Sequence, residues 1–151
     1  MHAACIQGLL PHIQSNLAYI IETLQAAAPA VPIVGMSYYD PLLGYWVLIE
    51  DGDLVAKTDE HAWEGFNAGL VSTYQAEGAH VADLASADFF NSADFTDTVV
   101  TKEFGEVPVN VANACTWTYF CAKPPFGPGN VHPNVKGYGV IATAFAEALS
   151  G

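Results

Sequence analysis

The stretch Val31-Pro32-Ile33-Val34-Gly35-Met36-Ser37-Tyr38-Tyr39 is the part of this sequence that decides the fold. It is a short and almost wholly apolar run, and Asp40-Pro41 ends it. Such runs are typical of strands that are buried on both faces, as in parallel sheets. A similar run, Ala79–Leu84, predicts a second strand further along the chain.

Three helices are predicted around these strands. A helix from about Asp59 to Ala76 lies between them, with Thr58 or Asp59 as its N-cap. Another ends the chain after Asn134, its expected cap. The first helix precedes both strands, and Pro11 is expected to start or kink it because proline removes a helical hydrogen bond. Its apolar positions recur at a helical period: Ile6, Leu9, Ile13, Leu17, Ile20, Ile21 and Leu24.

The order of the elements predicts an α/β fold with parallel strands joined by right-handed crossovers. The stretch through Asp51-Gly52-Asp53 is expected to be a loop, although Trp46 and Leu48 before it are unusually apolar. Periodicity is weak from Ala85 to Val131, which predicts a long loop. A loop of this length inside a compact domain is usually functional.

The composition limits the possible functions. With 151 residues, of which 52% are hydrophobic, residues 1–151 are expected to form a single domain. Four lysines and no arginine oppose sixteen acidic residues, for a formal net charge of -12, so binding to nucleic acids or anionic membranes is disfavoured. No apolar run reaches the roughly 18 residues of a membrane span. The first residues do not form a signal-peptide pattern.

Two strands are too few to shield a parallel sheet, which needs cover on both faces and protection at its edges. We therefore expect this chain to be part of a larger sheet and to form a homo-oligomer.

The three cysteines leave alternatives open. Cys115 and Cys121 lie close together in the sequence and could bridge a small loop, which leaves Cys5 over. An odd cysteine indicates a free thiol, an intermolecular bridge or a partner outside the chain. The spacing fits no zinc pattern, and we expect neither a metal nor a cofactor.

His132 is the leading candidate for chemistry. Pro133 holds it in the loop directly before the last helix, so the backbone is anchored while the imidazole can point into a cleft. That is the position that a general base needs. The alternative is a histidine that only caps or packs at the start of the helix.

Three segments carry a family resemblance. Along the chain they are Val34–Pro41, then Cys115–Cys121, then Gly127–Asn134 followed by Gly137-Tyr138. In this order they resemble the secreted actinobacterial branch of the SGNH (GDSL-type) ester hydrolases, and the resemblance extends from about Ala4 to Leu149. It implies a flavodoxin-like three-layer α/β/α sandwich, a carboxylic ester or lipid substrate, secretion, and a disulfide between Cys115 and Cys121.

The chain departs from that family in its catalytic residues. The Gly-Asp-Ser block with the nucleophile and the Gly-x-Asn-Asp block of the oxyanion hole are both missing, so the chain resembles an N-terminally truncated domain. Asn130 stands where the branch usually has the triad aspartate, and a neutral amide stabilises an imidazolium poorly. Ser37, at the end of the first strand, is an atypical candidate nucleophile, although a structural role is the simpler interpretation. Tyr38 and Tyr39 are expected to pack rather than react.

Three functions therefore compete. The first is an ester hydrolase with His132 as general base and a nucleophile from Ser37 or another chain. The second is a catalytically inactive half-domain that folds by self-association. The third is a binding module that uses the aromatic residues of its long loop.

Overall fold

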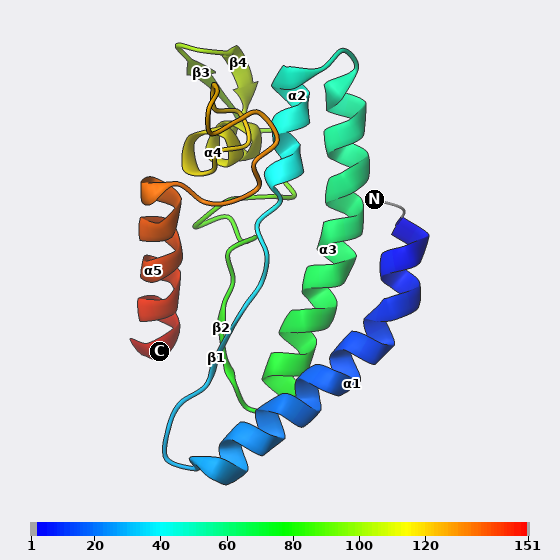
Figure 1. Cartoon of the computed structure of the whole chain (residues 1–151), viewed down its shortest axis with the longest axis vertical. Coiled ribbons are helices and arrows are strands. Elements are labelled where there is room, and N and C mark those ends of the chain that lie inside the picture. The colour runs from blue at the N-terminus through cyan, green and yellow to red at the C-terminus, as the bar shows by residue number, and fades with distance from the viewer. Residues whose placement is uncertain (1–2, 151) are drawn as a thin grey trace.

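The computed structural model describes the backbone of residues 3–150 and the side chains of residues 8–150. Two short strands, β1 (Val34–Met36) and β2 (His80–Ala82), pair in parallel, with Val34 opposite His80 and Met36 opposite Ala82. They run side by side through the middle of the molecule (Figure 1). The prediction of an α/β chain with a small parallel sheet is therefore confirmed.

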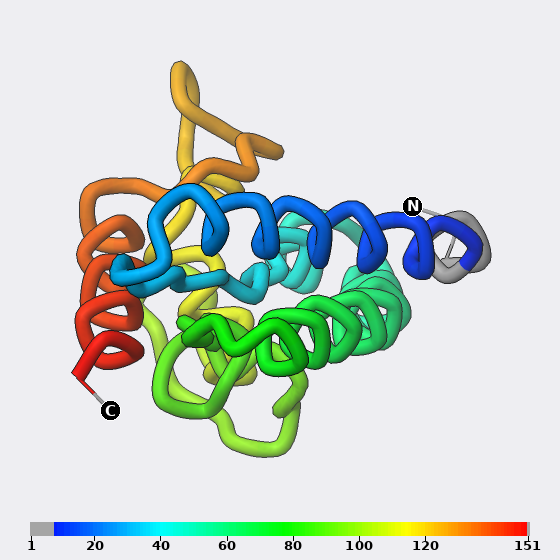
Figure 2. The backbone as a smooth tube through the Cα atoms, turned by 90° about the horizontal axis from the view of Figure 1, so that it is seen from below, coloured from blue at the N-terminus to red at the C-terminus, as the bar shows by residue number. Residues whose placement is uncertain are grey.

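Helices cover this sheet on both faces. Helix α3 (Gly52–Ala76) and helix α5 (Val135–Ser150) each contact both strands, and α1 (Ala3–Ala27) packs on α3. Figures 1 and 2 show α5 on one side of the strands and α3 with α1 on the other. The β3–β4 hairpin and α4, which follow β2 in the chain, lie at the end of the sheet to which the carboxyl ends of both parallel strands point (Figure 1).

The expectation that α1 starts at Pro11 is wrong, while the alternative expectation of a kink at this residue stays a prediction. The helix begins at Ala3 and contains Pro11, whose ring is exposed. Its packing on α3 explains why it tolerates the lost hydrogen bond. The Gln14 side chain, for example, donates to the Gly69 carbonyl oxygen at 3.1 Å.

The predicted start of α3 at Thr58 or Asp59 is also wrong, because the helix begins at Gly52. Asp51 adopts a left-handed conformation with a φ of 55°, so the Asp51-Gly52 turn leads straight into the helix. A Cβ on Gly52 would lie 1.9 Å from the Tyr45 carbonyl oxygen, so only glycine fits this close approach. Thr58 does not cap the helix; its hydroxyl donates to the Leu54 carbonyl oxygen one turn earlier.

The apolar stretch before Asp51 is helical rather than a loop. A 3₁₀ helix, η1 (Pro41–Gly44), leads into the short helix α2 (Tyr45–Leu48). Both pack on α3, and Leu43 and Trp46 belong to one of the two hydrophobic clusters. Burial in that cluster explains the apolar character of this stretch.

The prediction of one long loop from Ala85 to Val131 is wrong in its middle. The strands β3 (Thr98–Thr101) and β4 (Gly105–Pro108) form an antiparallel hairpin, and helix α4 (Val109–Trp117) follows it. Helix α4 is buried on several sides rather than on one, so its sequence shows no one-sided period. On either side of these elements, two loops remain outside the named helices and strands, residues 83–97 and residues 118–134. The second stands out from the body of the molecule (Figure 2).

Two local predictions are confirmed. The Asn134 side-chain oxygen accepts hydrogen bonds from the backbone N–H groups of Lys136 and Gly137, as a cap of α5 should. Cys115 and Cys121 form a disulfide. The side chain of Cys5 lies outside the described residues, so the three alternatives for this cysteine (a free thiol, an intermolecular bridge or a partner outside the chain) stay predictions.

Candidate functional site

A cavity of about 400 Å³ lies beyond the carboxyl end of β1. Its walls come from the segment after β1, from α3 and from the loop before α5. The residues that line it are Tyr38, Tyr39, Pro41, Leu42, Trp63, Val131 and His132. In parallel sheets this is the end at which ligand sites are built. Apart from the imidazole and two phenol groups, every lining side chain is apolar or aromatic, which suits a neutral, largely apolar ligand.

The loop that carries His132 is anchored on both sides of this residue. The backbone N–H of Tyr119 donates to the His132 carbonyl oxygen at 2.9 Å, and the Tyr39 hydroxyl donates to that of Val131 at 3.0 Å. Further along, the Asn134 side chain donates to the carbonyl oxygens of Thr116 and Thr118. The backbone at His132 is therefore held while its side chain stays exposed at the cavity.

Asn130 orients the backbone of His132. Its side-chain oxygen accepts the His132 backbone N–H at 3.0 Å, which closes a tight turn two residues long. Among the described residues, no hydrogen bond to the imidazole ring is formed. Asn130 thus supports the loop in this structure, and the imidazole nitrogens remain available to a ligand.

Ser37 lies next to Tyr38 in the sequence but does not line this cavity. It is completely buried, and its hydroxyl donates to a carboxylate oxygen of Asp83 at 2.6 Å while accepting the Ala85 N–H at 3.2 Å. These bonds tie the end of β1 to the chain that leaves β2. The structure brings Tyr38, Tyr39 and His132 together at the cavity, whereas Ser37 is bonded to Asp83 and Ala85 outside it.

The two tyrosines are held differently. The side chain of Asn67 on α3 forms two hydrogen bonds with the backbone of Tyr38. It accepts one from the Tyr38 N–H at 2.8 Å and donates one to the Tyr38 carbonyl oxygen at 2.7 Å. Tyr38 is 45% exposed, and the centre of its ring lies 6.2 Å from that of Trp63. Tyr39 stacks on Phe90 at 4.6 Å. Burial raises the pKa of Tyr39 to about 12, with Tyr138 and Tyr38 adding to the shift, so its hydroxyl stays a neutral donor.

Sequence reasoning singled out His132 but missed Trp63 and Asn67 as parts of the site. In the sequence, Trp63 is marked only as one of the regularly spaced apolar residues of the helix that ends at Ala76, and nothing local marks Asn67. The one usable signal is that a polar Asn67 falls on the same face of α3 as the buried Leu70.

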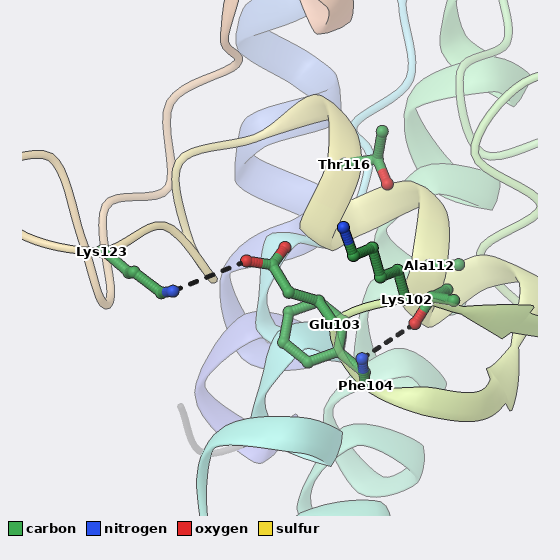
Figure 3. A pocket seen from close by; sticks show the side chains of 7 residues that line it. Lys102, Glu103, Phe104, Ala112, Thr116 and Lys123 are labelled. Carbon is green, nitrogen blue, oxygen red and sulfur yellow. Dashed lines mark hydrogen bonds and ion pairs between the residues drawn. The ribbon is translucent and has the colours of Figure 1, made fainter.

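A second cavity, of about 460 Å³, lies between the β3–β4 hairpin and α4. Lys102 and Lys123 reach it from two loops, and the Lys123 ammonium lies 4.0 Å from the Glu103 carboxylate (Figure 3). Both partners of this ion pair are exposed, and the cavity carries charges of both signs. It therefore indicates no single class of ligand.

Among the side chains of residues 8–150, no group of three or more histidine, cysteine or acidic residues is placed to hold a metal ion. In the same part of the chain, every helix falls short of the length or the apolar character that crossing a membrane requires. No family model, curated protein or solved structure matches the chain.

Proposed function

We propose that this chain supplies the general base and the substrate pocket of a carboxylic ester hydrolase. The observation that carries the proposal is the exposed imidazole of His132 at the mouth of an apolar cavity beyond the carboxyl end of β1. An ester is neutral and partly apolar, so it suits both this lining and a chain with a net charge of -12.

In the proposed reaction, His132 takes the proton of a hydroxyl nucleophile as the oxygen attacks the ester carbonyl carbon. The imidazolium then returns the proton to the leaving alkoxide. No serine, threonine or cysteine lines the cavity, and Ser37 is buried with its hydroxyl fully bonded. We propose that in the full protein the nucleophile comes from another chain or segment, as expected for the C-terminal part of an SGNH-type domain. In the isolated chain, a water molecule that His132 deprotonates takes its place and attacks an activated ester directly.

The fold supports this assignment in its general features. A parallel strand pair lies between α3 and α5, and the histidine directly precedes α5. The disulfide between Cys115 and Cys121 supports an oxidising compartment and hence a secreted protein.

The direct test measures cleavage of p-nitrophenyl acetate and butyrate by the wild-type chain, His132→Ala and His61→Ala. His61 is the matched control, because its side chain is 88% exposed on α3 and any free imidazole can cleave an activated ester slowly. A positioned general base contributes about 10²–10⁴-fold, so His132→Ala should lower turnover by about 100-fold or more. His61→Ala should keep it.

Equal losses in the two variants, or full turnover in His132→Ala, would contradict the proposal.

The second candidate function is a module that binds an apolar ligand without turnover, and the burial of Ser37 favours it. It predicts no cleavage by the wild-type chain, together with a ligand-dependent change in tryptophan fluorescence that Trp63→Phe abolishes.

A further inference from the structure

Two buried carboxyl groups lie behind the cavity wall. Asp40 follows Tyr38 and Tyr39 and is completely buried at the N-cap of η1, where one carboxyl oxygen accepts the Leu42 N–H at 2.8 Å. Glu60 lies on α3 and is only 4% exposed. Neither is expected inside a protein without a partner, because burying an isolated charge is very costly.

The two carboxyl groups lie within hydrogen-bonding reach of each other. The buried Oδ2 of Asp40 and Oε2 of Glu60 have no N–H or O–H donor among the described residues, so a hydrogen bond between the two carboxyl groups is the one that can satisfy these oxygens. Ionised carboxylates have only acceptor oxygens, so this hydrogen bond exists only while one of the two groups holds a proton. The pair therefore shares a proton.

We propose that the proton shared by Asp40 and Glu60 holds residues 38–42 against α3, and that its loss at mildly alkaline pH releases this segment and opens the cavity beside His132. The contact between Asp40 and Glu60 acts together with the two hydrogen bonds between the Asn67 side chain and the Tyr38 backbone. Both attachments come from α3, two turns apart, on either side of Trp63. Four of the seven residues that line the cavity lie in the segment that they hold.

Burial and the nearby negative charges favour retention of the proton. Burial is the main cause that raises the pKa of Glu60 to about 8, and the charge of Asp40, its hydrogen bond and the charge of Glu64 add to it. Burial likewise raises the pKa of Asp40 to about 7, against the opposing hydrogen bond from Leu42, and Asp59 adds to the rise.

The other charged groups near the pair do not replace the proton. Asp83, at the end of β2, lines a cavity together with Glu60 and Glu64 and adds negative charge. Lys57, one turn before Glu60, is directed to Asp53 at 3.7 Å and to the Trp46 ring. His61 lies beside Glu64 at 3.7 Å, and His132 faces the other cavity.

The sign of the effect follows from these raised pKa values. Between the ordinary carboxyl range near 4 and about 8, the folded chain binds more protons than the unfolded chain, so stability falls as the pH rises through that window. Above about pH 8, two buried carboxylates repel each other across the contact between η1 and α3.

The test follows the indole N–H resonance of Trp63, assigned by its loss in Trp63→Phe, in a pH titration from 5 to 9.5. The wild-type resonance should shift with an inflection near pH 8, accompanied by a fall of several degrees in the melting temperature. Glu60→Gln keeps a hydrogen-bond donor toward Asp40 but carries no titrating proton. It should lose the alkaline inflection and most of the fall in melting temperature.

Two controls separate the pair from general charge effects. Glu147→Gln removes one exposed carboxylate on α5 and should keep the inflection. His132→Ala should keep it too, which excludes titration of the histidine at the same cavity.

If Glu60→Gln does not fold, Asp40→Asn takes its place in the test. This variant leaves an oxygen to cap Leu42 and an amide that donates to Glu60, so the inflection of the Trp63 resonance should move to lower pH. A wild-type chain without an inflection above pH 6, or an unchanged inflection in Glu60→Gln, would overturn the proposal.

Discussion

Ser37 and Ser92 are both buried serines, but the loss of their hydroxyl groups should affect the stability of the fold differently. The Ser37 hydroxyl is bonded to Asp83 and to the Ala85 N–H, whereas that of Ser92 is buried without a hydrogen-bond partner among the described residues. Removing a bonded hydroxyl leaves its partners unsatisfied, and removing an unbonded one does not.

Ser37→Ala should therefore lower the free energy of unfolding by about 1–3 kcal/mol, while Ser92→Ala should be close to neutral or slightly stabilising. Urea denaturation of both variants gives the comparison. Because Ser37 is buried away from the cavity, Ser37→Ala should also keep any ester turnover of the folded chain. A loss of turnover in a stable Ser37→Ala variant would instead identify Ser37 as the nucleophile.

Helix α3 connects the parts of the site. Within one element it supplies Glu60 to Asp40, Trp63 to the cavity and Asn67 to the Tyr38 backbone. Its first residue, Gly52, sets where the helix leaves α2, because a side chain there would collide with the Tyr45 carbonyl oxygen. The register of the whole helix against the cavity therefore depends on this glycine.

Gly52→Ala should cost on the order of 3 kcal/mol, since the clash is with backbone and cannot be relieved by a rotamer change. Gly65→Ala in the middle of the same helix is the matched control. No atom lies within 4 Å of the added methyl group, so the variant should gain about 0.5–1 kcal/mol from helix propensity. Thermal unfolding followed by circular dichroism measures both; a tolerated Gly52→Ala would mean that α3 does not begin as described.

At the scale of the whole molecule, the described residues leave much apolar surface uncovered. Each strand of the parallel sheet has one neighbouring strand within residues 3–150, so each has one open edge. Large apolar side chains are exposed on the outer helices, among them Tyr19, Ile20 and Leu24 on α1 and Val135, Tyr138 and Leu149 on α5. Open strand edges and contiguous apolar surface both favour association.

We therefore expect the chain to self-associate, with a two-fold dimer as the default arrangement. Light scattering at micromolar concentration should give about twice the chain mass of 16.0 kDa. The melting temperature should rise with protein concentration, because only the folded chain associates. A folded monomer with a concentration-independent melting temperature would contradict this expectation.

The sequence alone determined the features that depend on neighbouring residues. The apolar runs at Val31–Tyr39 and Ala79–Leu84 contain the two parallel strands, and Asn134 caps the last helix as predicted. Cys115 and Cys121, six positions apart, form the predicted disulfide. Each of these follows from a local pattern of burial, capping or loop closure that needs no distant partner.

Tertiary structure decided what those patterns leave open. Hydrophobic periodicity could not show that α3 begins at Gly52, because the reason is contact with Tyr45. It could not find α4 either, since that helix is buried on several sides. In the candidate site, the proline before α5 pointed to His132, but the burial of Ser37 and the pairing of Asp40 with Glu60 depend on groups that lie far apart in the sequence. Whether a hydroxyl is exposed, or a carboxyl keeps its proton, depends on which side chains surround it, and only the folded chain brings those side chains together.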